Sequence, residues 1–249
     1  MTNMRKLSSN SLTYILVVLG FLVGVSLRDF VEQFEKSNEK IETNFIHPDN
    51  KWKIQMHYNG IQQKQLYKSG FYSQVGQDVT LLSIFENKFD GFFVDLASND
   101  AQYLSNTLAL ERHLGWQGLC IEPNPRYHAA YKERICTLVD AIAGKFDNEK
   151  ISFVFDDALG GISGFDKTTT DNENGTKLET VSLESIFKKM NVPTVINYMS
   201  LDVEGAELYV MSTFPFHKYR FDVITVERPK MLRVLLEKND YVYVTDHGT

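Results

Sequence analysis

The stretch between Gly91 and Pro123 constrains the fold of this chain more than any other part of the sequence. A short apolar run ending at Leu96 leads into a loop of small residues, and a helical segment follows from Tyr103 to Leu114. A second apolar run, from Leu119 to Ile121, comes next. Buried parallel strands have unbroken apolar runs, and a helix between two of them makes a right-handed βαβ unit. The stretch therefore predicts a right-handed βαβ unit with two parallel strands.

Polar residues stand where each of these two strands ends. In such a unit the ligand lies at the carboxyl ends of the strands, where the loop after the first strand approaches it with its backbone. An acid after the second strand accepts hydrogen bonds from the ribose hydroxyls. The loop from Asp95 to Ala101 and the side chain of Glu122 occupy these two places. The sequence therefore predicts a nucleotide-type binding site at this edge of the sheet.

Five short motifs follow one another between about Phe71 and Val244. They are Tyr72 to Asp78, Val94-Asp95 with Asn99-Asp100, Ser105 to Thr107, Leu119 to Pro125, and Ser200 to Glu207. In this order they resemble the motifs of the FkbM-type methyltransferases, a family of S-adenosylmethionine-dependent O-methyltransferases with a Rossmann-like, doubly wound α/β fold. The resemblance covers most of the chain beyond its N-terminal region and implies one such domain at residues 71–249.

The resemblance implies S-adenosylmethionine as the cofactor. The residues expected to bind it are Gln74, Gln77, Asp95, Ala97, Asn99, Asp100, Glu122, Asp140 and Ala141. The loop after Asp95 would hold the methionine end and the sugar, Glu122 would bind the ribose, and Asp140 with Ala141 would contact the adenine. An alternative for Glu122 is a cap on the helix that Pro123 introduces.

The first loop departs from the family pattern at two positions. The family usually has glycines where this chain has Ala97 and Ala101. If either residue has a positive φ, alanine costs roughly 1 kcal/mol there and adds a methyl group toward the cofactor.

A second group of acids, Asp202, Glu204 and Glu227, follows two later predicted strands and is expected to face the methyl acceptor. Transfer to a hydroxyl needs its oxygen deprotonated during the attack, so a positioned base or a metal is expected. The alternative is that Glu204 and Glu207 only stabilise the start of a helix near Gly205. No cluster in the sequence has zinc or iron spacing, so no residue is assigned as a metal ligand.

Composition excludes some classes of protein. The formal net charge is −6 and the sequence has no basic stripe, so a nucleic-acid partner is not expected. Of the two cysteines, Cys120 falls in a predicted strand and Cys136 at the start of another. Two buried free thiols are the prediction, with a disulfide bridge as the alternative.

The N-terminal region predicts a compartment. Residues 12–27 are uncharged and mostly apolar, and Arg5 and Lys6 precede them, which indicates a transmembrane anchor with residues 1–11 in the cytoplasm. A signal peptide cleaved near Gly24 or Ser26 is the alternative. Either way the large domain is expected in the lumen of the endoplasmic reticulum or Golgi, or outside the cell. The glycosylation sequon that begins at Asn174 is compatible with this location.

The residues after the predicted anchor divide into a stem and the large domain. Residues 28–70 are polar with scattered apolar positions and predict a partly helical stem. In the domain, helices are expected at 73–86, 103–114, 124–133, 181–190, 206–211 and 231–238, and strands at 92–96, 119–121, 135–139, 151–155, 195–201, 221–226 and 241–245. The chain stops before the last antiparallel strand of the family fold, so that strand is expected to be missing and its slot in the sheet unpaired.

Three hypotheses for function remain open. The first is a membrane-anchored O-methyltransferase that acts on a small-molecule or glycan hydroxyl. The second is a binding or trafficking protein of the secretory pathway that keeps the fold without catalysis. The alanines at positions 97 and 101 are the observation that suggests it. The third is a Golgi glycosyltransferase, which the absence of an Asp-x-Asp motif disfavours.

Overall fold

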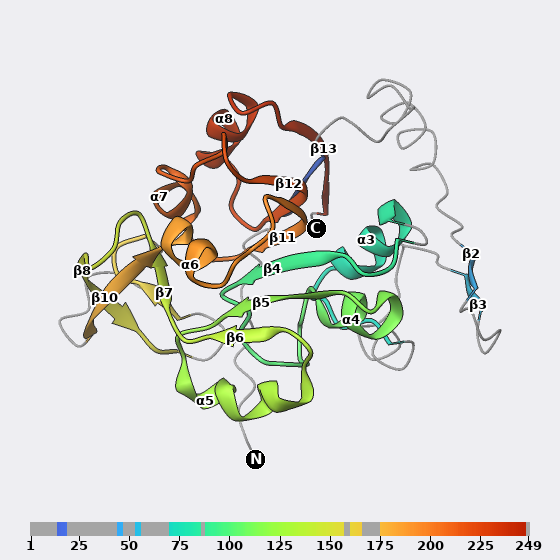
Figure 1. The fold of residues 1–249 in the computed structure, drawn as a ribbon, viewed down its shortest axis with the longest axis horizontal. Helices are drawn as coiled ribbons and strands as arrows, with labels where there is room; N and C mark the ends of the chain where they lie inside the picture. The colour runs from blue at the N-terminus through green and yellow to red at the C-terminus, as the bar shows by residue number, and fades with distance from the viewer. Residues whose placement is uncertain are drawn as a thin grey trace, which may run out of the picture.

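A computed structural model gives the fold (Figure 1). It describes residues 70–85, 88–156, 160–165 and 175–247, together with three short strands at residues 14–18, 44–46 and 53–55. The last two strands, β2 (Asn44–Ile46) and β3 (Lys53–Gln55), pair with each other inside the predicted stem. The remaining stem residues, most of the predicted anchor and Asn174 lie outside the described residues.

A seven-stranded sheet forms the centre of the domain, in the order β13-β1-β12-β11-β4-β5-β6. Its strands are β4 (Phe92–Leu96), β5 (Gln117–Ile121), β6 (Thr137–Val139), β11 (Val195–Leu201), β12 (Arg220–Val226), β13 (Val242–His247) and β1 (Tyr14–Val18). The five strands β6, β5, β4, β11 and β12 are parallel to one another. The chain runs outward from β4 through β5 to β6 and then returns to β11 and β12 on the other side. This confirms a mixed α/β fold with a parallel sheet, consistent with a Rossmann-like methyltransferase, and places the switch point between β4 and β11.

Strand β1 lies between β12 and β13 and is antiparallel to both. The sequence predicts an unpaired slot beside the last parallel strands, and in the described residues β1, from the N-terminal region, stands between β12 and β13. The missing C-terminal strand stays a prediction. Residues 14–18 also lie inside the predicted anchor, whose other residues are outside the described ones. In the described part of the chain no helix has the length and apolar character needed to cross a bilayer. Residues 14–18 cannot both pair in this sheet and cross a bilayer, so the anchor is an alternative to this pairing, and the anchor and the stem stay predictions.

Helices cover the two faces of the sheet. On one side, α3 (Gln77–Phe85) and α4 (Leu108–Leu114) pack into a core with Trp116 and Tyr198. On the other side, α6 (Leu183–Lys189), α7 (Glu207–Met211) and α8 (Leu232–Glu237) contribute to a second core around Phe187 and Phe221. A short helix α5 (Pro125–His128) and a 3₁₀ helix η1 (Ala129–Glu133) connect β5 to β6. The helices cover the two faces of the sheet, and loops follow the carboxyl ends of its parallel strands.

Helix α4 begins at Leu108, so the prediction of a helix from Tyr103 is wrong at its start. Leu104 has a φ of +60°, which no right-handed helix allows. The hydroxyl of Ser105 accepts hydrogen bonds from the backbone N–H groups of Thr107 and Leu108, at 3.4 and 3.1 Å. Residues 101–106 therefore extend the ligand-side loop.

A second sheet, with the order β7-β10-β8-β9, lies beyond β6. Its strands are β7 (Ile142–Gly144), β8 (Lys150–Val154), β9 (Gly161–Ile162) and β10 (Thr176–Ser182). Only β8 is predicted, because β10 is polar and its partners are distant in sequence. β10 pairs with β7 on one side and β8 on the other. The helix predicted from Val181 starts two residues later, where Ser182 caps it by accepting from the N–H of Ser185.

Cys120 and Cys136 form a disulfide, so the prediction of two free thiols is wrong. β5 and β6 are neighbouring parallel strands in which Cys120 pairs with Leu138. Cys136 immediately precedes β6, and its Cα atom lies 5.8 Å from that of Cys120. A sequence separation of 16 residues does not reveal this contact, because the register of β5 and β6 decides it.

Candidate functional site

Asp95 is the penultimate residue of β4, at the switch point, and is 3% exposed. Its Oδ2 atom accepts a hydrogen bond of 2.6 Å from the hydroxyl of Thr107. Its neighbour on β11 is Ser200, which also bonds to the carboxylate. Burial raises the pKa of Asp95 to about 6, and the Thr107 bond and the charge of Arg134 oppose that rise. Asp95 is therefore a buried carboxylate that stays ionised at neutral pH.

The loop after Asp95 contains strained backbone. Ala97 has a φ of +57° and Asn99 a φ of +54°. Asn tolerates this region, whereas alanine loses about 1–2 kcal/mol there. Ala101 is buried and its φ is not positive. Of the two alanines that depart from the family pattern, only Ala97 thus stands where a glycine is favoured.

Glu122 joins this loop to the loop that follows β5. One carboxylate oxygen accepts from the backbone N–H of Asn99 at 2.8 Å, and the other accepts from the N–H of Asn124 at 2.7 Å. Burial raises the pKa of Glu122, and these two bonds act against it. The cap of α5 is Asn124, which accepts from the N–H of Arg126. Each oxygen of Glu122 keeps a second lone pair that can accept from a ribose hydroxyl.

Two other residues predicted to bind the cofactor, Asp140 and Asp100, differ in their surroundings. Asp140 follows β6 and is exposed, next to the half-buried Ala141. The N–H of Glu122 donates to the carbonyl of Val139, so Asp140 lies close to Glu122 along the sheet edge. Asp100 accepts from the N–H groups of Gln102 and Tyr103, so it shapes the loop.

The segment before α3 is held by Asp78, which is fully buried and accepts from the N–H groups of Tyr72, Ser73 and Val79. Gln77 is also fully buried. Its side-chain oxygen accepts from the N–H of Val75 at 3.0 Å, while its Nε2 has no hydrogen-bond partner among the described residues. Such a donor costs free energy unless a ligand or water pairs with it. Gln74 is half-buried on the same segment.

The three acids predicted for catalysis come together. Carboxylate oxygens of Asp202, Glu204 and Glu227 lie within 4.8 Å of one another. Arg228 forms an ion pair with Glu204, and its Nε lies 3.4 Å from Glu227. Burial and the charge of Asp202 raise the pKa of Glu227 far above its usual range, so that Glu227 carries a proton at neutral pH. Asp202 is the partly exposed member of the group.

The turn that carries these acids is also strained. Glu204 has a φ of +53° and Gly205 a φ of +94°. A Cβ atom at Gly205 would stand 2.7 Å from the carbonyl oxygen of Phe165, so the loop after β9 lies directly over this turn. Glu207 is buried, its pKa is raised by burial to about 7, and it accepts from the N–H of Gly205. This bond agrees with a structural role for Glu207.

Sequence reasoning missed several residues of the site. Arg134 contacts the first loop. The Tyr131 hydroxyl donates to the Asn99 carbonyl at 2.9 Å, so its 2.7 Å contact with the Ser98 hydroxyl is one in which Tyr131 accepts. Asn106 is buried and donates to Ser200 at 2.9 Å. Only Asn106 carried a signal, as a member of one of the five motifs.

Acids thus stand on both sides of the switch point of a parallel sheet, which is where ligands of α/β proteins bind. The sequence profile of the methyltransferase FkbM domain matches residues 90–243, which is more than half of the 249 residues. The chain therefore belongs to the FkbM methyltransferase family. No curated protein and no solved structure matches it.

The strain at Ala97 gives a testable difference between the two alanines. Ala97→Gly is expected to raise the free energy of unfolding by about 0.5–1 kcal/mol, because glycine accepts a positive φ without steric cost. Ala101→Gly, the matched control, should lower it by about as much, because its φ gains nothing from glycine. Urea unfolding of both variants measures this. Shifts of the same sign would contradict the backbone assignment.

Proposed function

We propose that this chain is an S-adenosylmethionine-dependent O-methyltransferase that acts on a hydroxylated acceptor. The observation that carries the proposal is the division of acids at the switch point. Asp95 and Glu122 stand on the β4–β5 side, and the Asp202 group stands at the ends of β11 and β12. This division provides one place for a cofactor and a neighbouring place for an acceptor.

The residues on the first side fit the cofactor. Glu122 offers two acceptor atoms to a ribose, and Asp95 offers a negative charge to the positive methionine end. The unpartnered Nε2 of Gln77 is a donor that suits the carboxylate of that same end. S-adenosylmethionine would supply a methyl group bound to a positively charged sulfur.

The residues on the second side fit proton removal from an acceptor. As the new bond between oxygen and methyl forms and the sulfur–methyl bond breaks, the hydroxyl proton needs a base. Glu227 already carries a proton, and Glu204 is paired with Arg228. Asp202 is therefore the proton acceptor in this proposal. Glu204 and Glu227 set the charge around it.

A non-catalytic role is the second candidate, favoured by the strain of alanine at position 97. A protein of that kind would keep the fold and the first loop and bind a partner or ligand without methyl transfer. Cofactor binding and turnover together distinguish the two candidates.

The cofactor proposal predicts a specific loss on mutation of Glu122. Glu122→Ala should weaken the binding of S-adenosylmethionine by about 1.5–3 kcal/mol, because charge-assisted hydrogen bonds to the ribose are lost. Isothermal titration of the folded variant measures this, with a nucleotide sugar as the competing ligand. Glu237→Gln, which removes one charge from an exposed ion pair, is the control. Parental affinity in the Glu122 variant would contradict the assignment.

The catalytic proposal predicts that substitutions of Asp202 and of Glu227 differ in their effect on turnover. Asp202→Asn should lower turnover about 10²–10⁴-fold and leave cofactor affinity nearly unchanged, because a base is lost. Glu227→Gln should change turnover less than about tenfold, because the glutamine amide replaces a carboxyl that is already neutral. The assay follows labelled methyl from S-adenosylmethionine to a panel of free glycans and phenols. The reverse order of the two effects would make Glu227 the base.

We further propose that the domain lies in the lumen of the secretory pathway or outside the cell, behind an N-terminal anchor. The charges around residues 12–27 support this, and the Cys120–Cys136 disulfide adds support because such bonds persist in oxidising compartments. Glycan hydroxyls are acceptors found there. In sealed microsomes a protease is expected to leave the domain intact until detergent is added. Digestion without detergent would contradict the topology.

A further inference from the structure

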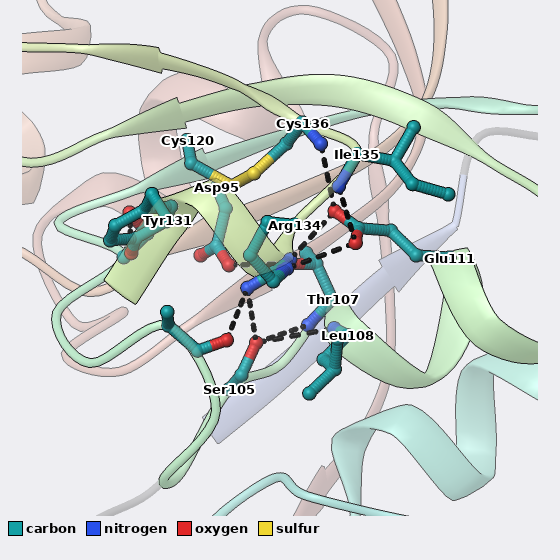
Figure 2. Close-up of polar contacts among 12 residues, drawn as sticks. Asp95, Ser105, Thr107, Leu108, Glu111, Cys120, Tyr131, Arg134, Ile135 and Cys136 are labelled. Atoms are coloured by element: carbon teal, nitrogen blue, oxygen red, sulfur yellow. Dashed lines mark hydrogen bonds and ion pairs between the residues drawn. A yellow bond between two sulfur atoms is a disulfide. The ribbon is translucent and has the colours of Figure 1, made fainter. Parts of the chain in front are cut away.

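Arg134 lies at the centre of a buried polar network beside the first loop (Figure 2). Its side chain is fully buried, as is nearly all of that of Glu111, with which it forms two contacts of 3.0 Å. Its remaining N–H groups donate to the Ala101 carbonyl at 2.8 Å, the Ser105 hydroxyl at 3.1 Å and the Thr107 hydroxyl at 2.8 Å. These five contacts match the five N–H groups of a guanidinium.

The contact between Arg134 and Thr107 determines the direction in which the Thr107 hydroxyl donates its hydrogen bond. A guanidinium can only donate, so the Thr107 oxygen accepts from Arg134. The single hydroxyl proton of Thr107 is then free to point at Asp95, to which it donates at 2.6 Å. Figure 2 shows the three side chains in this sequence. Arg134 therefore acts on Asp95 both through its charge and through a polarised hydroxyl.

The place of Arg134 is fixed from two sides. Glu111 also accepts from the backbone N–H groups of Ile135 and Cys136, at 3.0 and 3.1 Å. The disulfide of Cys136 reaches Cys120 on β5, which is the residue that pairs with Asp95 across the sheet. Arg134 is thus tied to the strand beside Asp95.

We propose that Arg134 is a positioning residue for cofactor binding, which holds the loop from Ala101 to Thr107 and keeps Asp95 ionised through the Thr107 hydroxyl. The inference rests on the proposed cofactor. An ionised Asp95 attracts the positive methionine end, and a protonated one does not. Both the charge of Arg134 and its link through Thr107 lead to the expectation that the titration of Asp95 depends on Arg134.

Asp95 is surrounded by several other groups that titrate or carry charge. Asp202 on the β11 side and Glu122 on the β5 side act as negative neighbours, and Tyr131 from η1 and Tyr198 from β11 face it as neutral phenols. Arg134 is the cation that opposes the effect of burial on Asp95. Removal of Arg134 or of its link should therefore move the titration of Asp95 upward.

The test compares Thr107→Val and Arg134→Met with the full-length parent. Carboxyl NMR of aspartate-labelled protein should give a midpoint for Asp95 at about 6 in the parent. It should lie about one pH unit higher in Thr107→Val and about one to three units higher in Arg134→Met. Thr107→Val keeps the Arg134–Glu111 pair, so it carries the test if Arg134→Met does not fold. Thr213→Val, which removes a surface hydroxyl bond, is the matched control and should not move the midpoint.

Titration with S-adenosylmethionine gives the second readout. The affinity of the parent for S-adenosylmethionine should fall as the pH decreases through 6. In Thr107→Val the same fall in affinity should occur at a pH about one unit higher. An Asp95 midpoint that is unchanged in Thr107→Val would overturn the inference and leave Arg134 a structural residue. If the parent binds no S-adenosylmethionine, the proposed function fails, and the NMR midpoints still decide whether Arg134 acts on Asp95.

Discussion

The buried pair of Arg134 and Glu111 is the interaction on which the first half of the site depends. Burial of two charges costs several kcal/mol for each ion unless every remaining donor and acceptor is used. Here the guanidinium meets five acceptor contacts, and Glu111 also accepts from two backbone N–H groups. Because a half-satisfied network is worse than an apolar core, the loop from Ala101 to Thr107 and the segment that starts at Arg134 must be placed together.

The free-energy cost of burying the acids at the edge of the sheet is offset in four different ways. Asp95 has Thr107 and a nearby cation, Glu122 has two backbone N–H groups, and Glu204 has Arg228. Glu227 has a proton. In a chain with a net charge of −6, these local partners decide which carboxylates stay charged. They separate a charged β4–β5 side from a β11–β12 side that carries a protonated carboxyl.

The sequence predicts the parallel strands well, because β4, β5, β11 and β12 are apolar runs of the right length. It predicts the convergence of Asp202, Glu204 and Glu227, because neighbouring parallel strands end at one edge. It does not predict β10, whose polar residues depend on distant partners, or the disulfide, which depends on strand register. Arg134 is missed for the same reason. An isolated arginine after a helical turn has the pattern of a surface residue, and only tertiary contacts show that it is buried.

Backbone strain relates the two halves of the site. Among the described residues, those with a positive φ that are not glycine, asparagine or aspartate are Ala97, Leu104 and Glu204. Two lie in the loop after β4 and one in the turn after β11. Strain of about 1–3 kcal/mol at a residue persists only where the surroundings enforce it, and it clusters at sites that bind or react. Ala97 and Glu204 are therefore places on the two sides of the switch point where the surrounding structure holds the backbone in one conformation.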